Sequence, residues 1–255
     1  MKTNQAFEIL KNAGGIRAAK IILQNRKKLP FFWVLYTAHK LRHNVPVAKI
    51  IHEKWFYGLP FYTNKWTLDP RPDSETLVEA VLKNESFNKN LNILDLGTGT
   101  GCLIISIVKN IPNAHGVAIE KSRHAVKVAK RNVNNLGLKN KIKVLHASFS
   151  SNKTFGKFDI IISNPPYISR GDKRVDNGAR HDPSMALYAK NNGLAAYEII
   201  ARNAKKWLKP NGKIYMEIGA DQGLDIREIF AKQGWAFFNS FYDLSGIERV
   251  LAFNF

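Results

Sequence analysis

The sequence is poor in cysteine, with only Cys102 among 255 residues. A single thiol excludes an intramolecular disulfide and a zinc site built from several cysteines, and it is typical of a reducing compartment. Long apolar runs are missing too, since the longest near the N-terminus, residues 29–37, is too short to span a bilayer. No secretion signal opens the chain. We therefore expect a cytoplasmic protein with no membrane anchor and no bound metal.

Acidic residues are also scarce, with 20 Asp and Glu against 39 Lys and Arg, which gives a net charge of +19. Residues 1–54 hold eleven of these basic residues against Glu8 and Glu53. Such a surplus favours an acidic partner, such as a nucleic acid or a ribosome-associated protein. A genome rich in Lys and Asn codons would produce the same bias. Both interpretations stay open, because net charge concerns association and not fold.

The chain divides into three parts by composition. Residues 1–54 have a helical apolar pattern and an aromatic cluster at 31–36, interrupted at Gly14, Gly15 and Pro30. Residues 55–75 combine prolines with many aromatic residues, which predicts an ordered connector. Residues 76–255 form one larger domain. We expect a small helical N-terminal domain, a connector and a main domain.

The main domain alternates apolar strands with amphipathic helices. We predict strands at 92–96, 115–120, 142–145, 158–163 and 213–218, and two more near 235–242 and 248–253. A helix is expected from 194 to 208, followed by a turn at 210–212, and Ser122 is expected to cap another helix. This alternation predicts an α/β fold with a doubly wound, seven-stranded, mostly parallel sheet. In such sheets ligands bind beyond the carboxyl ends of the strands.

A glycine-rich loop follows the first of these strands. Its alternating glycines allow a tight turn and a close approach of a ligand to the backbone. The G-x-G-x-G spacing lacks the G-x-x-G step of a dinucleotide-binding loop. An acid just before the loop would repel a pyrophosphate but can accept hydrogen bonds, directly or through water, from the cationic end of S-adenosyl-L-methionine. The predicted cofactor residues of this loop are Asp95, Gly97, Thr98, Gly99, Thr100 and Gly101.

Glu120 ends the second predicted strand, about twenty residues after the glycines. An acid at this position can accept hydrogen bonds from both ribose hydroxyls of the cofactor. The alternative is a charge at a helix N-terminus, and we favour ribose binding. Cys102 is interpreted as a small buried helix residue.

A second loop, Asn164-Pro165-Pro166-Tyr167, follows the fourth predicted strand. Prolines commonly end strands, but that does not explain the Asn or the Tyr. The side-chain oxygen of Asn164 and the carbonyl of Pro165 can together accept hydrogen bonds from one NH₂ group, which orients a delocalised nitrogen toward a methyl donor. The prolines stiffen the turn, and Tyr167 offers a ring face for stacking. These four residues are the predicted catalytic group.

With these motifs the chain resembles the release factor glutamine N5-methyltransferases (the PrmC/HemK family), which have the class I, Rossmann-like methyltransferase fold. The NPPY tetrapeptide also occurs in amino-methyltransferases of DNA and RNA, so other segments carry the resemblance. They are residues 57–62 (YGLPFY), 69–75 (DPRPDSE), 181–187 (HDPSMAL) and 217–219 (EIG). The similarity runs from about residue 43 to the end of the chain.

The resemblance implies methylation of the side-chain amide nitrogen (N5) of the glutamine in the Gly-Gly-Gln motif of peptide chain release factors. It implies that the helical domain, 1–54, contacts the release factor, and we expect a monomer. It also implies a contact of Asn164 with the cofactor. The substrate-binding residues that it implies are Arg71, Pro72, Glu75, Asn164, Pro165, Pro166 and Tyr167.

One position departs from the family pattern. Ser148 stands where the family usually has an aspartate that binds the adenine amino group of the cofactor. A serine can still accept a hydrogen bond, but a charge-assisted bond is about twice as strong. We therefore expect weaker cofactor binding through Ser148.

Two other functions are compatible with the sequence. An amino-methyltransferase acting on RNA or DNA bases would fit the NPPY loop and the basic charge, although residues 69–75 and the lack of an added recognition domain argue against it. The second alternative is a non-catalytic protein that kept the fold, and the serine at position 148 is its only support. Transfer of a labelled methyl group either to a release factor or to nucleic acid separates the expected function from the nucleic-acid alternative. A titration with S-adenosyl-L-methionine tests the non-catalytic alternative.

Overall fold

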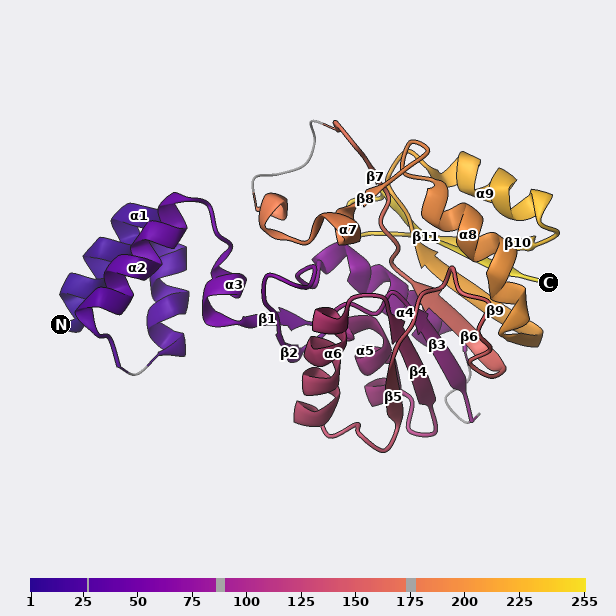
Figure 1. The fold of residues 1–255 in the computed structure, drawn as a ribbon, viewed down its shortest axis with the longest axis horizontal. Coiled ribbons are helices and arrows are strands. Elements are labelled where there is room, and N and C mark those ends of the chain that lie inside the picture. Colours follow the sequence, from indigo (N-terminus) through magenta and orange to yellow (C-terminus); the bar gives the residue numbers. More distant parts are fainter. Residues whose placement is uncertain (27, 86–89, 173–177) are drawn as a thin grey trace.

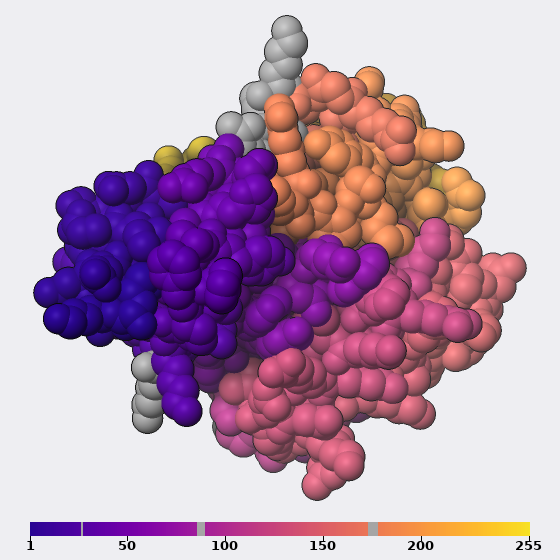
Figure 2. All heavy atoms as spheres, turned by 60° about the vertical axis from the view of Figure 1, so that its left-hand side comes forward, coloured from indigo at the N-terminus to yellow at the C-terminus, as the bar shows by residue number. Residues whose placement is uncertain are grey.

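The computed structural model describes residues 1–26, 28–85, 90–172 and 178–255. The N-terminal helices form a lobe beside the sheet domain (Figures 1 and 2). They are α1 (Thr3–Asn25), α2 (Phe31–Arg42) and α3 (Val47–Ile51). Helix α1 is kinked at Gly15, whose φ of 85° is left-handed, as expected from the glycine pair there. This lobe has its own apolar cluster, which includes Leu10, Ile22 and Val34.

The helical part ends earlier than expected. His52 adopts a left-handed φ of 61° directly after α3 and stops the helix. Residues 53 and 54, expected to belong to the helical part, lie instead in a hairpin of β1 (Glu53–Phe56) and β2 (Leu59–Tyr62). The hairpin and the segment after it lead to α4 (Glu75–Asn84).

The main domain is built on a seven-stranded sheet, as predicted. Its order is β10-β11-β9-β6-β3-β4-β5, with β11 antiparallel to both neighbours and the five strands from β9 to β5 parallel. The strands are β3 (Asn92–Leu96), β4 (His115–Glu120), β5 (Ile142–His146), β6 (Phe158–Ser163), β9 (Leu208–Glu217), β10 (Ala236–Tyr242) and β11 (Glu248–Asn254). Two short strands, β7 (Ile168–Ser169) and β8 (Tyr188–Ala189), pair outside this sheet.

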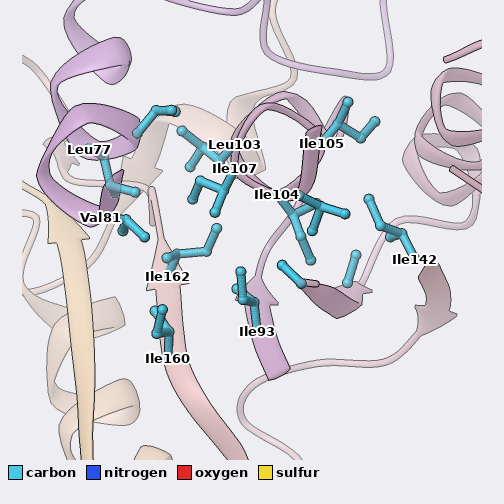
Figure 3. Packing of buried hydrophobic residues seen from close by; sticks show 14 of the residues in the cluster. Leu77, Val81, Ile93, Leu103, Ile104, Ile105, Ile107, Ile142, Ile160 and Ile162 are labelled. Atoms are coloured by element: carbon cyan, nitrogen blue, oxygen red, sulfur yellow. The ribbon is translucent and has the colours of Figure 1, made fainter. Parts of the chain in front are cut away.

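Both faces of the sheet are buried beneath helices. Ile160 and Ile162 of β6 pack in one cluster with α4, α5 (Cys102–Asn110) and α6 (Arg123–Asn135). Ile161 packs on the opposite face with α8 (Ala195–Asn203) and α9 (Gly223–Lys232). Figure 3 shows the first cluster, where the β6 side chains point toward α4 and α5. Two-sided burial explains why β6 is almost wholly apolar.

Local predictions hold for most elements. The Ser122 hydroxyl accepts a hydrogen bond from the backbone N–H of Ala125 and caps α6, as expected. The turn expected at 210–212 is wrong, since these residues lie inside β9. There the pairing with β6 shifts between Phe158 and Ile160, and Asn211 has a left-handed φ of 62°. The proline, asparagine and glycine therefore make a bulge and not a turn.

The segment between β6 and β9, which holds β7, β8 and α8, also contains α7 (Ser184–Leu187). No helix in the described part of the chain is long and apolar enough to cross a membrane.

Candidate active site

A cavity of about 550 Å³ lies at the carboxyl ends of the parallel strands. Its floor comes from the loops after β3, β4, β5 and β6, and its other walls from the connector, the α7 region and α8. The floor residues are Gly97, Thr98, Gly99, Thr100, Glu120, Lys121, Ser122, Ala147, Ser148, Phe149, Ser150, Asn164, Pro165 and Pro166. The sheet therefore brings together two loops that lie more than sixty residues apart in the chain.

The glycine loop forms an open cradle in this floor. Gly97, Gly99 and Gly101 all have positive φ, at 76°, 56° and 84°. The backbone N–H groups of Gly97 and Thr98 donate to the Ile119 carbonyl of β4, at 2.9 and 3.1 Å, and hold the loop against that strand. A Cβ built on Gly99 would meet no atom within 4 Å, so the space beside the loop is open to a ligand. Gly101 precedes α5 and does not line the cavity among the described residues.

Glu120 lines the cavity and also braces the glycine loop. Its Oε2 accepts a hydrogen bond from the Gly99 N–H at 3.1 Å, and its Oε1 accepts one from the Ser122 N–H at 2.8 Å. Each carboxylate oxygen can accept a second hydrogen bond. Both interpretations of Glu120 thus have structural support, because a helix-terminal contact leaves acceptor capacity for two ribose hydroxyls.

Asp95 lies behind the glycine loop and not on the cavity wall. Its side chain is fully buried, and Thr98 Oγ1 donates to its Oδ2 at 2.5 Å. Burial raises the pKa of Asp95 to about 7, although the hydrogen bond from Thr98 opposes that rise. Its Oδ1 has no hydrogen-bond partner among the described residues. An unpaired buried acceptor of this kind suits a cationic ligand group reached through the loop or through water.

Ser148 lies in the floor of the cavity, two residues after the end of β5. Its Oγ is 2.8 Å from Oγ of Ser150 and accepts a hydrogen bond from the Ser150 N–H at 3.1 Å. The hydroxyl is therefore shared with a local turn. Phe149, which the sequence analysis left unassigned, lies in the same wall and approaches Gly97.

Asn164 is oriented by a residue distant in sequence. Its Nδ2 donates a hydrogen bond to Oγ of Ser74 at 3.1 Å. With the amide nitrogen held by the connector, Oδ1 is left as an acceptor for a ligand in the cavity. Pro165 and Pro166 line the cavity beside it. The sequence gives no sign of this role for Ser74, because a local pattern cannot reveal a partner ninety residues away.

Tyr167 is placed differently from the expected stacking position. It does not line the cavity among the described residues, and its ring packs against the cluster under α8 and α9. Burial raises the pKa of its hydroxyl, with a further contribution from Glu217. Its carbonyl accepts a hydrogen bond from Nε2 of Gln222 at 3.0 Å. In this structure Tyr167 therefore anchors the substrate loop from behind.

Of the three substrate-binding residues expected in the connector, one lines the cavity and two do not. Arg71 lines the cavity and pairs with Asp182, with 2.7 Å between Nη2 and Oδ2. Pro72 and Glu75 are not among its described lining residues. Oε1 of Glu75 instead accepts a hydrogen bond from the Tyr57 N–H at 2.7 Å, which ties α4 to the hairpin.

Several residues that line the cavity could not be predicted from the sequence. Trp66 lies in the wall formed by the connector and stacks on His124 of α6, with 4.1 Å between ring centroids. Arg170 and Met185 come from the segment after β6. Cys102, expected to be buried, is of intermediate burial and reaches the cavity wall, and desolvation raises the pKa of its thiol to about 12.

The chain is similar in sequence to known methyltransferases. Residues 68–180 match the model of the Methyltransferase small domain family. The bifunctional methyltransferase of Rickettsia felis is 37% identical over 244 residues, which cover 84% of this chain but only 46% of that protein. The chain thus spans about half the length of such bifunctional relatives. The release factor glutamine methyltransferase of Agrobacterium fabrum is 38% identical over 217 residues, covering 82% of this chain and 74% of the relative. The chain belongs to the release factor glutamine methyltransferase family.

Solved structures agree on the fold. The hMettl16 catalytic domain, solved with the MAT2A 3'UTR hairpin 6, superposes with a TM-score of 0.61 at 20% identity, covering 78% of this chain and 76% of that one. The family and the fold identify a methyltransferase of class I whose cofactor is S-adenosyl-L-methionine. The open cradle at Gly99 and the unpaired Oδ1 of Asp95 fit this cofactor, and Glu120 and Ser148 line the same cavity.

Proposed function

We propose that the protein methylates the side-chain amide nitrogen, N5, of the glutamine in the Gly-Gly-Gln motif of peptide chain release factors. The observation that carries this proposal is the orientation of Asn164, whose nitrogen is held by Ser74 while its oxygen remains an acceptor beside Pro165. The name of the Agrobacterium fabrum relative supports a release factor as the substrate.

The arrangement addresses the weak nucleophilicity of an amide. The bound cofactor supplies a sulfonium methyl group, and the reaction forms an N–C bond as the S–C bond breaks. Oδ1 of Asn164 and the carbonyl of Pro165 would accept both hydrogens of the substrate NH₂ group and aim its lone pair at the methyl carbon. The proton lost from nitrogen leaves after methyl transfer, so no strong base is needed. Asn164, Pro165 and Pro166 are the residues we assign to this role.

We also propose that residues 1–54 contact the release factor. Phe31, Phe32 and Tyr36 of α2 are 51%, 83% and 57% exposed, and basic residues surround them in the sequence. Exposed aromatic residues next to cations are typical of protein interfaces. Arg71 would help to wall the glutamine pocket, because it lies between the connector and the α7 region.

Mass spectrometry after incubation with cofactor tests the function. A purified release factor should gain 14 Da on the Gly-Gly-Gln peptide, the mass of one methylene. Parallel reactions with labelled cofactor and transfer RNA, ribosomal RNA or DNA should show no transfer. Methylation of a nucleic acid and not of the release factor would replace this proposal with the amino-methyltransferase alternative, which the basic surface also permits.

A further inference from the structure

We propose that Glu217 is a positioning residue that holds the Asn164 amide in its reactive orientation through the Ser74 hydroxyl. This inference rests on the proposed function, since Asn164 is the residue that binds the substrate nitrogen there. Glu217 ends β9, the strand next to β6 in the sheet, and the two strands pair up to Ser163 and Met216. The end of β9 and the start of the substrate loop are therefore neighbours.

The three side chains form a short relay. Asn164 Nδ2 donates to Ser74 Oγ at 3.1 Å. Burial raises the pKa of the Glu217 carboxyl, and the Ser74 hydroxyl and the Asn164 amide beside it oppose that rise. Glu217 is 2% exposed, and its Oε2 has no hydrogen-bond partner among the described residues. A buried carboxyl this poorly satisfied costs stability, which indicates a role other than packing.

The direction of the hydrogen bonds explains what the relay does. An ionised carboxylate only accepts, so it draws the Ser74 proton toward itself. The Ser74 oxygen then offers its lone pairs to the Asn164 NH₂ group. That leaves Oδ1 of Asn164 directed away from Ser74, as the proposed substrate contact requires. Without the carboxylate, the serine hydroxyl could donate to Asn164, and the amide could turn over and present its nitrogen to the substrate.

The supports on either side of the relay are rigid. Leu77 and Val81 of α4, the helix that begins just after Ser74, pack beside Ile162 of β6 (Figure 3). Tyr197 of α8 donates its hydroxyl proton to the Glu217 carbonyl at 2.9 Å. Ser74, Asn164 and Glu217 thus sit on separate elements that are each locked into the core, which suits groups that must keep one geometry.

Protonation of Glu217 should lower the rate of turnover. Burial raises its pKa to about 7. The charged or titratable groups around it are Asp73 before α4, Arg249 on β11, Tyr167 after β6, Tyr197 on α8 and Cys102 on α5. Of these, Asp73 raises the pKa of Glu217 and Arg249 lowers it. As the pH falls through 7 the carboxyl gains a proton and the relay loses its acceptor, so turnover at saturating cofactor should fall while cofactor affinity stays.

The experiment compares Glu217→Gln, Ser74→Ala and Ser74→Thr with the wild type. Methylation of a purified release factor is measured at saturating cofactor from pH 6 to pH 8.5, and cofactor affinity is measured by titration calorimetry. We expect turnover of Glu217→Gln and Ser74→Ala to fall by about tenfold to a hundredfold, the scale of a misplaced reacting group, without the decline below pH 7. Ser74→Thr keeps the hydroxyl and should keep both rate and pH profile. Affinity for the cofactor should change by less than about twofold.

Two results distinguish the outcomes. A wild type that methylates no release factor overturns the proposed function, whereas an active wild type matched by Glu217→Gln in rate and pH profile overturns the relay. If Glu217→Gln does not fold, the contrast between Ser74→Ala and Ser74→Thr still decides. A readout without turnover is the side-chain amide signal of Asn164 in nuclear magnetic resonance. It should shift with a midpoint near pH 7 in the wild type and not in Glu217→Gln, and an unchanging signal in the wild type would also reject the relay.

Discussion

Asn164 presents two chemical groups to two different partners, and its function depends on keeping them apart. The nitrogen is bound to Ser74, so the oxygen is the group available to a substrate. The side chain is part-buried, and in the proposed function its oxygen contacts the substrate. A substitution here should therefore separate catalysis from folding.

We predict that Asn164→Ala lowers the methylation rate by about 10² or more, the scale of losing one preorganised polar contact in a transition state. Initial rates with a release factor at saturating cofactor measure this, and titration calorimetry should find cofactor binding nearly unchanged. Asn84→Ala is a matched control, because Asn84 makes a single local bond to the Ala80 carbonyl at 2.8 Å at the end of α4. Near-normal turnover of Asn164→Ala would remove the residue from the mechanism.

Ser148 tests the placement of adenine. Ser148→Asp should tighten cofactor binding by about 1 kcal/mol, because a charged acceptor replaces a neutral one and can still accept from the Ser150 N–H. Calorimetric titration with S-adenosyl-L-methionine measures the change. Ser151→Asp controls for added negative charge, since Ser151 does not line the cavity among the described residues. Weaker or equal binding by Ser148→Asp would mean that another group contacts adenine.

At the scale of elements, the burial of Asp95 at the end of β3 makes the free energy of unfolding depend on pH. Asp95 is buried there with its pKa raised to about 7 from 3.8. Between those values the folded protein holds a proton that the unfolded chain has released. The free energy of unfolding therefore decreases as the pH rises through this window and levels off above about 7.

We predict that Asp95→Asn removes this dependence. Relative to the variant, the wild type without cofactor should lose about 1.4 kcal/mol of unfolding free energy per pH unit between pH 4 and pH 7. Denaturant unfolding at several pH values measures both proteins, and their difference isolates Asp95 from the other titrating groups. Parallel profiles would show that Asp95 titrates near its ordinary pKa in the folded state.

Helix α3 joins the lobe to the active-site walls through Lys49. Its Nζ lies 2.7 Å from Oδ1 of Asp69 and 2.9 Å from Oδ1 of Asp182, and all three residues are buried. Asp69 follows the hairpin and Asp182 precedes α7, so one cation bridges three segments. Burial raises the pKa of Asp182, while Lys49 opposes that rise.

Lys49→Ala should reduce the free energy of unfolding by about 3–5 kcal/mol, because it leaves the buried Asp69 without a cation and Asp182 with Arg71 alone. The control is Lys11→Ala, whose exposed pair with Glu8 at 3.1 Å should contribute less than about 1 kcal/mol. Urea unfolding at pH 7 compares the variants. A loss as small as that of the control would show that water replaces the bridge.

At the scale of the whole molecule, the lobe and the sheet domain have separate apolar clusters. The exposed aromatic residues of α2 belong to neither core, and Phe32 is the most exposed of them. The lobe is therefore free to present this surface to a partner while the sheet domain holds the chemistry.

We predict that Phe32→Ser lowers kcat/KM for the release factor by about tenfold or more, the cost of one aromatic anchor at an interface, with cofactor affinity unchanged. Leu244→Ser is the matched control, since Leu244 is fully exposed in the turn between β10 and β11. Equal kcat/KM for the two variants would place the release factor elsewhere on the molecule.

The sequence alone was sufficient for the features that depend on neighbouring residues. The limits of β3, β4 and β6 agree with the predicted strands, because apolar runs bounded by turn residues are local signals. The position of Glu120 at the end of β4 and of the substrate loop after β6 follows from the same signals. Both reach one cavity, because parallel strands place their carboxyl ends along one edge of a sheet.

Tertiary structure alone decided which side chains meet. Asn164 finds Ser74 ninety residues away, and Glu75 turns to Tyr57 and not to the cavity. Tyr167 packs behind its loop, since the apolar cluster under α8 and α9 competes for the ring. The segment 210–212 has turn residues but forms a bulge inside β9, because β9 pairs with β6 on both sides of it, at Leu208 and again from Lys213. These outcomes depend on contacts between segments far apart in the chain, and a local sequence pattern carries no information about such contacts.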